Sequence, residues 1–301
     1  MNKIFITGAS GFIGRKLVSA IDTKKNTLRV LSRSNLTSIE TVVCDLRLGN
    51  IPDEALKGVD TVFHLAGIAH DSTKQDDQYI KVNVRATEKL AELAAISGVR
   101  RFVFLSSVKA GGSLLKDLSI TESDQSEPEG IYGKTKREAE LKLLEIGRQS
   151  GMHVSVVRSS LVYGPSMKGN LGMMFLGIEK GWFPSLPKVA NRRSMVHVDD
   201  LVKAILLVAK DDRTNGEIFI VTDGVPHSSR EIYEIMCELL GRSIPKWYVP
   251  KFIFNFVAFF SLSLMQKVNK LFEDDYYSSK KIQSIGFKPQ RSLKEMNETS
   301  F

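Results

Sequence analysis

The sequence predicts an α/β protein in which a parallel β-sheet is covered by helices on both faces. Short segments that are apolar throughout alternate with segments whose apolar residues recur at helical spacing, over about the first 160 residues. A glycine-rich turn joins the first apolar segment to the first helical one. Strands without a polar face need cover on both sides, which is the situation of strands in parallel sheets. The length of 301 residues, with 43% hydrophobic and 25% charged residues, suits one large domain or one and a half.

The elements follow in a regular order. The expected strands cover residues 3–6, 28–31, 41–44, 61–65, 101–105, 154–157 and 217–221, and the expected helices cover 78–96, 138–146, 198–210 and 229–240. After Arg158 the alternation fades, and the glycines and prolines of 164–194 predict loops and short helices of a substrate-binding half. Ligands of such folds lie beyond the carboxyl ends of the strands.

The glycine-rich turn spans Thr7 to Gly14, between the first strand and the first helix. Gly8 allows a tight exit from the strand, Gly11 allows a pyrophosphate to approach the backbone, and Gly14 allows close packing of helix on strand. Free N–H groups at the start of the helix favour an anion. A glycine turn with no ligand is the alternative, but the strand before and the helix after it favour a dinucleotide. The turn residues expected to bind it are Gly8, Ser10, Gly11, Phe12, Ile13 and Gly14.

We therefore expect a Rossmann-type doubly wound sheet with a smaller C-terminal α/β substrate-binding region. The predicted dinucleotide-binding domain comprises 1–163 and is rejoined by about 195–222; the substrate-binding region comprises 164–194 and 223–301. The first strand begins near the first residue, which argues against a signal peptide there.

Charge and composition narrow the class of partner. The net charge of +8 is compatible with nucleic acid, an anionic membrane face or anionic small molecules. No run of lysine and arginine exceeds two residues and no basic stripe is interleaved with aromatic residues, so we expect no nucleic-acid binding. Cys44 and Cys237 are expected to be buried free thiols, and the five histidines lack metal-binding spacing, so no metal is expected.

Tyr132 and Lys136 are four residues apart in a predicted helix, so their side chains lie on one face. An ammonium group beside a phenol favours the phenolate, which would lower the pKa of Tyr132 and let it exchange a proton with a sugar hydroxyl. Such a pair is common by chance. Ser107, which follows the fifth strand, strengthens the interpretation, since its hydroxyl can bond a reacting carbonyl oxygen alongside the tyrosine.

Eight motifs occur in a fixed order along almost the whole chain, from Met1 to about Phe287, and they are highly specific in combination. They are Gly8-Ala-Ser-Gly-Phe-Ile-Gly14, Asp45-Leu46, His64-Leu65-Ala66-Gly67, Asn83-Val84, Ser106-Ser107, Tyr132-x-x-x-Lys136, Val162-Tyr163-Gly164-Pro165 and His197-Val198-Asp199-Asp200. In this the sequence resembles the extended short-chain dehydrogenase/reductase family, in its nucleotide-sugar epimerase/dehydratase branch.

The resemblance implies roles by position. Ser107, Tyr132 and Lys136 would be the catalytic triad, with Tyr132 as the acid/base and Lys136 also contacting the nicotinamide ribose. The further cofactor contacts implied are Asp45, Leu46, Leu65, Ala66, Gly67 and Asn83. Asn170 and Arg193 would bind the substrate diphosphate, Ser107 and Tyr132 its sugar, and His70 is a candidate for the edge of the sugar pocket.

The sequence departs from the family pattern at the end of the second strand. Leu31-Ser32-Arg33-Ser34 has no acidic residue, although an acid there binds the ribose 2′-hydroxyl and an arginine favours a 2′-phosphate. We therefore expect NADP(H), with NAD(H) as the alternative.

The activity implied is oxidoreduction at C4 of a UDP-sugar. Lys109 after the triad serine, Phe183-Pro184 and the stretch Asn191–Ser194 resemble reductases of UDP-4-keto-6-deoxy-N-acetylhexosamines, which serve bacterial surface polysaccharide (O-antigen) biosynthesis. A UDP-glucose/UDP-N-acetylglucosamine 4-epimerase is the alternative, and a non-catalytic dinucleotide sensor or scaffold is a third. The family also implies a cytoplasmic homodimer formed by the helices of 76–97 and 131–150.

Residues 252–265 form a conspicuous run of fourteen mostly apolar residues between Lys251 and Lys267. A membrane span needs about 20 apolar residues, so no transmembrane helix is expected. The expected structure is a helix packed on the protein or in a dimer interface. Contact with a membrane surface is the alternative.

Overall fold

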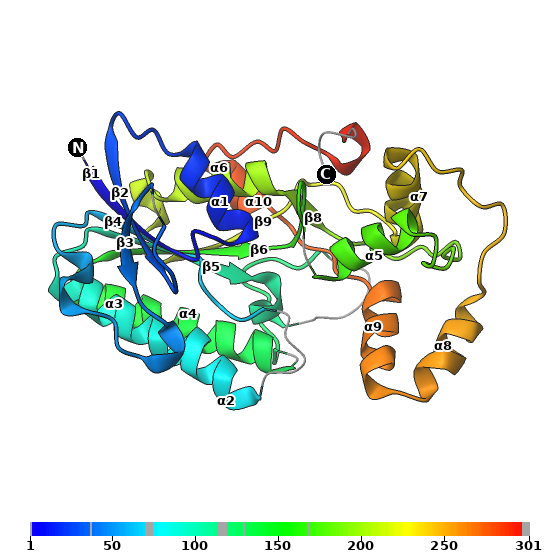
Figure 1. The fold of residues 1–301 in the computed structure, drawn as a ribbon, viewed down its shortest axis with the longest axis horizontal. Helices are drawn as coiled ribbons and strands as arrows, with labels where there is room; N and C mark the ends of the chain where they lie inside the picture. The colour runs from blue at the N-terminus through cyan, green and yellow to red at the C-terminus, as the bar shows by residue number, and fades with distance from the viewer. Residues whose placement is uncertain are drawn as a thin grey trace.

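A seven-stranded, wholly parallel β-sheet organises the protein (Figure 1). The computed structural model describes residues 2–36, 38–69, 75–112, 119–128, 130–167 and 169–296. The strand order is β3-β2-β1-β4-β5-β6-β9. The strands are β1 (Asn2–Thr7), β2 (Asn26–Ser32), β3 (Glu40–Val43), β4 (Thr61–His64), β5 (Arg101–Ser107), β6 (His153–Ser159) and β9 (Glu217–Val221). The predicted strands and the predicted fold class are confirmed.

Helices cover the two faces of the sheet and enclose a hydrophobic core on each. One core joins the sheet to α3 (Ala86–Ile96) and α4 (Gly130–Ser150), and the other joins it to α1 (Phe12–Ala20) and α6 (Val198–Val208). Figure 1 shows α3 and α4 below the sheet and α1, α6 and α10 (Lys280–Ser284) above it. The central strands are buried on both sides, which explains their uninterrupted apolar sequences. The short helical turns are η1 (Leu46–Leu48), η2 (Asp53–Leu56), η4 (Val108–Gly111), η5 (Asp212–Thr214) and η6 (Leu293–Glu295).

Two helices differ in extent from the prediction. The helix expected over 78–96 begins earlier, as α2 (Asp76–Tyr79), and passes through a π-helical segment (Ile80–Arg85) into α3. The helix expected over 138–146 is α4, which starts at Gly130. Its first turns contain glycines, which weaken helix propensity, but they pack tightly: a Cβ on Gly133 would lie 2.6 Å from the carbonyl oxygen of Lys109. Tertiary packing therefore extends this helix beyond its apolar pattern.

A smaller group of elements lies at the other end of the molecule. The strands β7 (Leu161–Tyr163) and β8 (Met195–His197) form a separate parallel pair, and α5 (Gly169–Glu179) and α7 (Ser229–Leu239) pack around a third core. Ser228 caps α7 by accepting a hydrogen bond from Glu231 N, and the Glu231 carboxylate accepts one from Ser228 N. The division into two domains stays a prediction.

The apolar run 252–265 forms two helices instead of one. These are α8 (Lys251–Phe259) and α9 (Leu262–Phe272), separated at Ser261, which caps α9. Most described side chains of the run are exposed, so the expectation that it packs on its own chain is wrong, whereas its place in a dimer interface stays a prediction. A short helix can turn only a narrow row of side chains toward the protein, and the run has more aromatic residues than such a row can hold. Within the described ranges, no helix is long and apolar enough to cross a bilayer.

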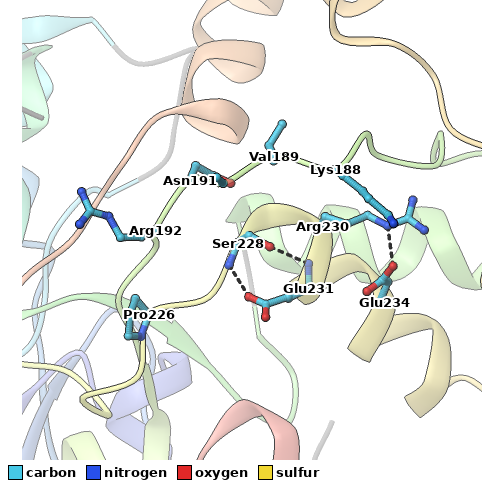
Figure 2. Close-up of a pocket in the computed structure, with 10 residues that line it drawn as sticks. Lys188, Val189, Asn191, Arg192, Pro226, Ser228, Arg230, Glu231 and Glu234 are labelled. Atoms are coloured by element: carbon cyan, nitrogen blue, oxygen red, sulfur yellow. Dashed lines mark hydrogen bonds and ion pairs between the residues drawn. The ribbon is translucent and has the colours of Figure 1, made fainter. Parts of the chain in front are cut away.

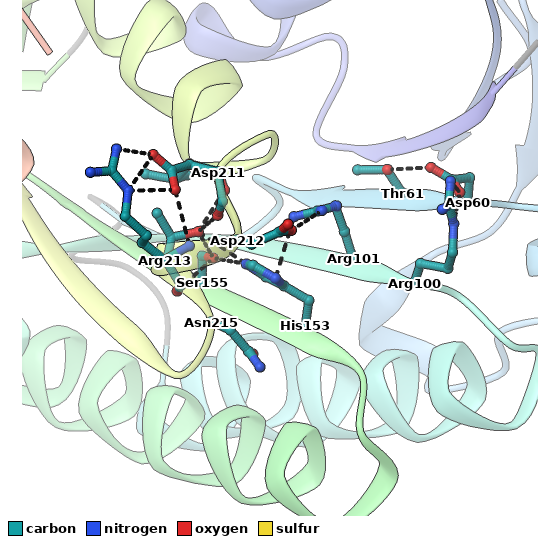
Figure 3. Close-up of polar contacts among 12 residues, drawn as sticks. Asp60, Thr61, Arg100, Arg101, His153, Ser155, Asp211, Asp212, Arg213 and Asn215 are labelled. Carbon is teal, nitrogen blue, oxygen red and sulfur yellow. Dashed lines mark hydrogen bonds and ion pairs between the residues drawn. The ribbon is translucent and has the colours of Figure 1, made fainter. Parts of the chain in front are cut away.

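At the amino-terminal edge of the sheet, charged side chains are paired with one another (Figure 3). Arg101 forms an ion pair with Asp212, and Arg213 donates to both oxygens of Asp211, at 2.9 and 2.5 Å. His153 Nε2 lies 3.1 Å from Ser155 Oγ. These contacts join the ends of β5 and β6 to the segment before β9, which is a structural role.

Candidate active site

The glycine turn forms a tight cradle between β1 and α1. Gly8 has a φ of 75°, and a Cβ there would lie 2.8 Å from Ala66 N, so only glycine fits without strain. A Cβ on Gly14 would lie 2.0 Å from the carbonyl oxygen of Gly8. Gly11 N donates to Gly8 O at 2.9 Å, which closes the turn. The backbone of the first helical turn is thereby brought close to the strand.

The start of α1 suits the pyrophosphate of a dinucleotide. Gly11 caps the helix without a side chain, and the first turn carries no acidic residue. Ser10 is exposed, and Gly11, Phe12 and Ile13 are partly exposed, so a ligand can approach this turn. A helix start with free N–H groups and no side chain in front of it favours an anion. The cradle therefore fits the group that the sequence predicted.

Ser107, Tyr132 and Lys136 meet at the carboxyl end of β5. Ser107 ends the strand, and its side chain is hydrogen-bonded to Tyr132, which lies in the first turns of α4. Lys136 lies one turn further and is 4% exposed. Its Nζ donates to Leu105 O at 3.0 Å and lies 4.5 Å from the centre of the Phe104 ring. The three residues predicted as a triad are thus brought together.

The protonation of the pair differs from the expectation. Burial raises the pKa of Tyr132 to about 12, against which the hydrogen bond from Ser107 acts. Burial lowers the pKa of Lys136 to about 8, and the charge of Glu140 opposes this lowering. The expected lowering of the Tyr132 pKa is therefore not found, because burial of the phenol outweighs every other influence. At neutral pH the phenol of Tyr132 stays protonated.

A buried ion pair lies behind the triad. Glu140 follows Lys136 by four residues on α4, and Arg158 lies on β6; both side chains are 1% exposed. Arg158 Nη2 donates to Glu140 Oε2 at 2.6 Å, Arg158 Nε donates to Oε1 at 3.0 Å, and Ser106 Oγ also donates to Oε1. The carboxylate thus joins α4 to β5 and β6, the elements that hold the triad.

The loop after β4 connects the glycine turn to the triad. Ala66 N donates to Thr7 Oγ1 at 3.1 Å, and a Cβ on Gly67 would lie 3.2 Å from Lys136 Nζ. Asn83 is buried, accepts from Ile68 N at 2.8 Å and donates to Ile68 O at 3.0 Å. Asn83 therefore supports the loop of Leu65, Ala66 and Gly67, the predicted cofactor contacts on this strand edge.

The ends of β2 and β3 form the predicted ribose and adenine side. Arg33 follows β2 and is exposed, and its charge helps lower the pKa of Asp45, an effect that comes mainly from hydrogen bonds with Arg47. Asp45 Oδ1 accepts from Arg47 N at 3.0 Å and so caps η1, whose first residue, Leu46, is buried. Arg47 and Arg33 thus both act on the Asp45 carboxylate at this edge.

Near the residues predicted to bind the substrate, the carboxylate of Asp275 forms ion pairs with two basic side chains. Lys109 Nζ lies 2.5 Å from Asp275 Oδ1, Arg193 Nη2 lies 3.7 Å from Oδ2, and Tyr277 donates to Oδ1 at 3.2 Å. Arg193 Nη1 also donates to Lys270 O at 2.6 Å. Lys109 N donates to Ser107 Oγ at 3.3 Å, so the backbone of Lys109 adjoins the triad.

The remaining predicted substrate residues are less constrained. Asn170 is exposed in the first turn of α5, and His70 lies outside the described residues.

An open pocket of about 420 Å³ lies beside the segment Lys188–Arg192 and the start of α7 (Figure 2). Ion-paired Arg230 and Glu234 line it, 2.7 Å apart, whereas none of the triad does. We therefore place the chemistry at the carboxyl edge of the sheet and not in this pocket.

Sequence reasoning missed two residues of the site. Glu140 continues the spacing of four that joins Tyr132 to Lys136, so helical periodicity offered a signal. Asp275 lies 166 residues from Lys109 along the chain, and no local pattern connects them.

His197, expected to be structural, caps α6 by accepting a hydrogen bond from Asp199 N at 3.2 Å. Within the described part of the chain, no group of histidine, cysteine, aspartate or glutamate residues has the composition of a metal site.

Comparison with known proteins gives concordant matches. Residues 4–222 match the NAD dependent epimerase/dehydratase family. The chain is 29% identical to a UDP-glucose 4-epimerase of Vibrio cholerae, over 97% of this chain and 92% of the relative. It is 26% identical to an N-acetyl-α-D-glucosaminyl-diphospho-ditrans,octacis-undecaprenol 4-epimerase of Escherichia coli O157:H7, over 83% and 76%. Among solved structures, MoeE5 in complex with UDP-glucose and NAD matches with a TM-score of 0.80 and 25% identity, over 98% of this chain and 95% of that one.

Proposed function

Because the chain belongs to the NAD dependent epimerase/dehydratase family, we propose that it transfers hydride between a nicotinamide dinucleotide and C4 of a UDP-sugar. The observation that carries this proposal is the hydrogen bond of Ser107 to Tyr132, with Lys136 one helical turn away. These groups adjoin the loop that packs on the glycine turn. The UDP-glucose bound by MoeE5 and the names of both curated relatives support a sugar linked to a diphosphate.

We propose that the enzyme works as a reductase of a UDP-4-keto-6-deoxy-N-acetylhexosamine, for surface polysaccharide. The nicotinamide, when bound, supplies the hydride. Tyr132 donates its phenolic proton to the C4 oxygen, and Ser107 holds that oxygen by a hydrogen bond. Lys136 remains largely protonated at neutral pH and stabilises the phenolate that results. Burial raises the pKa of Tyr132, so its phenol is protonated at neutral pH, which is the form that the reductive direction requires.

The finer resemblance in sequence is to UDP-N-acetylquinovosamine dehydrogenase. It depends on Lys109 after the triad serine and on the stretch Asn191–Ser194. In the structure Lys109 and Arg193 both contact Asp275, so these two distinguishing segments form one cluster. We infer that this cluster, with Asn170, receives the diphosphate and sugar of the substrate. Arg193 would have to exchange contacts with Asp275 for contacts with the diphosphate.

A 4-epimerase is the second candidate, and the names of the two curated relatives favour it. It would use the same residues, with Tyr132 accepting a proton in the first half and returning it in the second. The two reactions differ in whether the dinucleotide is consumed. For the cofactor we propose NADP(H), because Arg33 and Arg47 lie beside Asp45, the only acid described at this edge, and can receive a 2′-phosphate.

The test is a panel of UDP-sugars and UDP-4-keto-sugars with NADH and NADPH, followed at the nicotinamide absorbance. Stoichiometric oxidation of the reduced cofactor by a 4-keto substrate supports the reductase. Interconversion of UDP-sugars without net cofactor change supports the epimerase. Tyr132→Phe should lower kcat by at least about a hundredfold, since general acid catalysis contributes that much. Tyr248→Phe, a matched change at an exposed tyrosine, should leave kcat unchanged; equal activity of Tyr132→Phe would favour a sensor or scaffold instead.

A further inference from the structure

The hairpin formed by α8 and α9 carries an unusual amount of exposed apolar surface. Of the eighteen exposed large apolar side chains in the described ranges, ten lie between Trp247 and Met265. The exposed fractions of Phe252, Phe256, Phe259 and Phe260 lie between 66% and 76%. Figure 1 shows the hairpin projecting from the end of the molecule that carries α5 and α7, with its turn pointing away from the sheet. Monomeric soluble proteins rarely leave such a patch uncovered.

The exposure follows from the way the two helices pack. The apolar side chains of α8 that turn inward are Phe254, which meets Phe272 edge to face at 5.3 Å, and Ala258, which is buried. Lys251 Nζ also lies over the Phe272 ring, 5.3 Å from its centre. Phe254 and Ala258 are four residues apart, so the inward-facing apolar stripe of α8 is one side chain wide. The other aromatic residues of α8 therefore point away from α9, so they do not stabilise the hairpin itself.

The charged residues in and before the hairpin are all positive. Between Glu238 and Glu273 there is no aspartate or glutamate, and the five charged residues are Arg242, Lys246, Lys251, Lys267 and Lys270. Exposed Trp247 and Tyr248 precede α8. This distribution suits the interface of an anionic bilayer. It combines apolar side chains at the tip, a tryptophan and a tyrosine behind them, and lysines around them.

We propose that the α8–α9 hairpin docks on an anionic membrane surface. Phe252, Phe256, Phe259 and Phe260 enter the boundary between headgroups and acyl chains, and the lysines lie at the level of the lipid phosphates. Neither helix spans the bilayer, since α8 has 9 residues and α9 has 11. A second copy of this chain fits less well, because the hairpin carries Lys251, Lys267 and Lys270 and no carboxylate, so two hairpins would bring six cations together.

Docking would orient the candidate substrate site. Arg193 Nη1 donates to Lys270 O in the last turn of α9, and Asn191 Nδ2 donates to Leu271 O at 3.3 Å. The base of the hairpin is thus bonded to the segment that we assign to the substrate diphosphate. The docking itself does not depend on the proposed function.

The experiment uses the full-length chain and vesicles of phosphatidylcholine with or without one quarter phosphatidylglycerol. We expect co-sedimentation with the anionic vesicles and much weaker binding to the neutral ones. Phe256→Glu with Phe260→Glu should weaken binding at least tenfold, since two buried aromatic side chains are replaced by anions. Leu48→Glu with Ile96→Glu makes the matched change at exposed apolar residues far from the hairpin and should leave binding unchanged.

Two further measurements keep the test decisive. Lys246→Gln with Lys267→Gln should weaken binding to anionic vesicles by about fivefold per lysine and affect neutral vesicles little. In a Trp182→Phe background, the fluorescence of Trp247 should shift to shorter wavelength on binding. Absence of vesicle binding, or binding that the phenylalanine changes leave intact, would overturn the proposal. So would a lipid-free dimer that the same changes dissociate, since a second copy would then cover the hairpin.

Discussion

The ion pair of Glu140 with Arg158 offers a sharp test of how the triad is supported. Glu140→Gln keeps the size of the side chain but removes the charge that Arg158 needs. Arg158 is 1% exposed and donates to this carboxylate from both Nε and Nη2, so water cannot replace the lost partner. Breaking a buried pair from one side costs about 3–5 kcal/mol, because it leaves an uncompensated buried charge. That is a large part of the roughly 5–15 kcal/mol by which domains are stable.

Urea unfolding followed by circular dichroism measures this loss. With an m-value of roughly 2–3 kcal/mol per molar urea, the midpoint should fall by about 1–2.5 M. The control is Glu145→Gln on the same helix, where Glu145 and Arg148 are 49% and 72% exposed. Exposed pairs contribute about 0–1 kcal/mol, so the control should change little.

A double variant separates pairing from packing. Glu140→Leu with Arg158→Met removes both charges and keeps apolar volume, so it should recover most of the stability that Glu140→Gln loses. If Glu140→Gln costs less than about 1 kcal/mol, or if the double variant is no more stable than the single one, the carboxylate does not hold these elements together. Loss of the Glu140 charge should also lower the pKa of Lys136 further, because that charge now raises it.

Three further perturbations test other parts of the site. Gly14→Ala places a Cβ 2.0 Å from the carbonyl oxygen of Gly8, so the turn must shift and dinucleotide affinity measured by calorimetry should fall more than tenfold; unchanged affinity would contradict the cradle. Arg33→Asp should raise the ratio of kcat/KM for NADH to that for NADPH at least tenfold, and an unchanged ratio would remove Arg33 from cofactor selection. Burial lowers the pKa of His64 to about 3, so between pH 6.5 and pH 3 the unfolded chain binds a proton that the folded chain refuses, and stability falls as pH falls. At pH 5 the loss is about 2 kcal/mol relative to pH 7.5, and His64→Gln should remove it from the urea-derived pH dependence while the other histidines contribute equally to both proteins.

The sheet and the parts of the candidate site that depend on local patterns could be predicted from the amino-acid sequence. A strand that is buried on both faces is apolar throughout, so its burial can be predicted from its sequence. Gly8 is required by its positive φ, and Gly14 by the nearby carbonyl oxygen of Gly8, which leaves no room for a Cβ. The spacing of Tyr132 and Lys136 places them on one helical face without knowledge of the fold. These features depend on neighbours within one or two turns of chain, which is why they could be predicted.

Which distant charges meet, and which apolar residues stay exposed, depends on tertiary packing and could not be predicted from the sequence. Lys109 and Arg193 meet at Asp275 because three segments of the chain converge beyond the sheet. The spacing of Tyr132 and Lys136 suggested a lowered pKa for Tyr132, but burial in the folded protein raises it. The apolar run of 252–265 has the composition of a buried helix. Its division at Ser261 and its projection from the body depend on how α8 and α9 attach to the rest of the chain. Composition specifies how much surface a segment needs to bury, but the fold decides whether the chain itself supplies the cover.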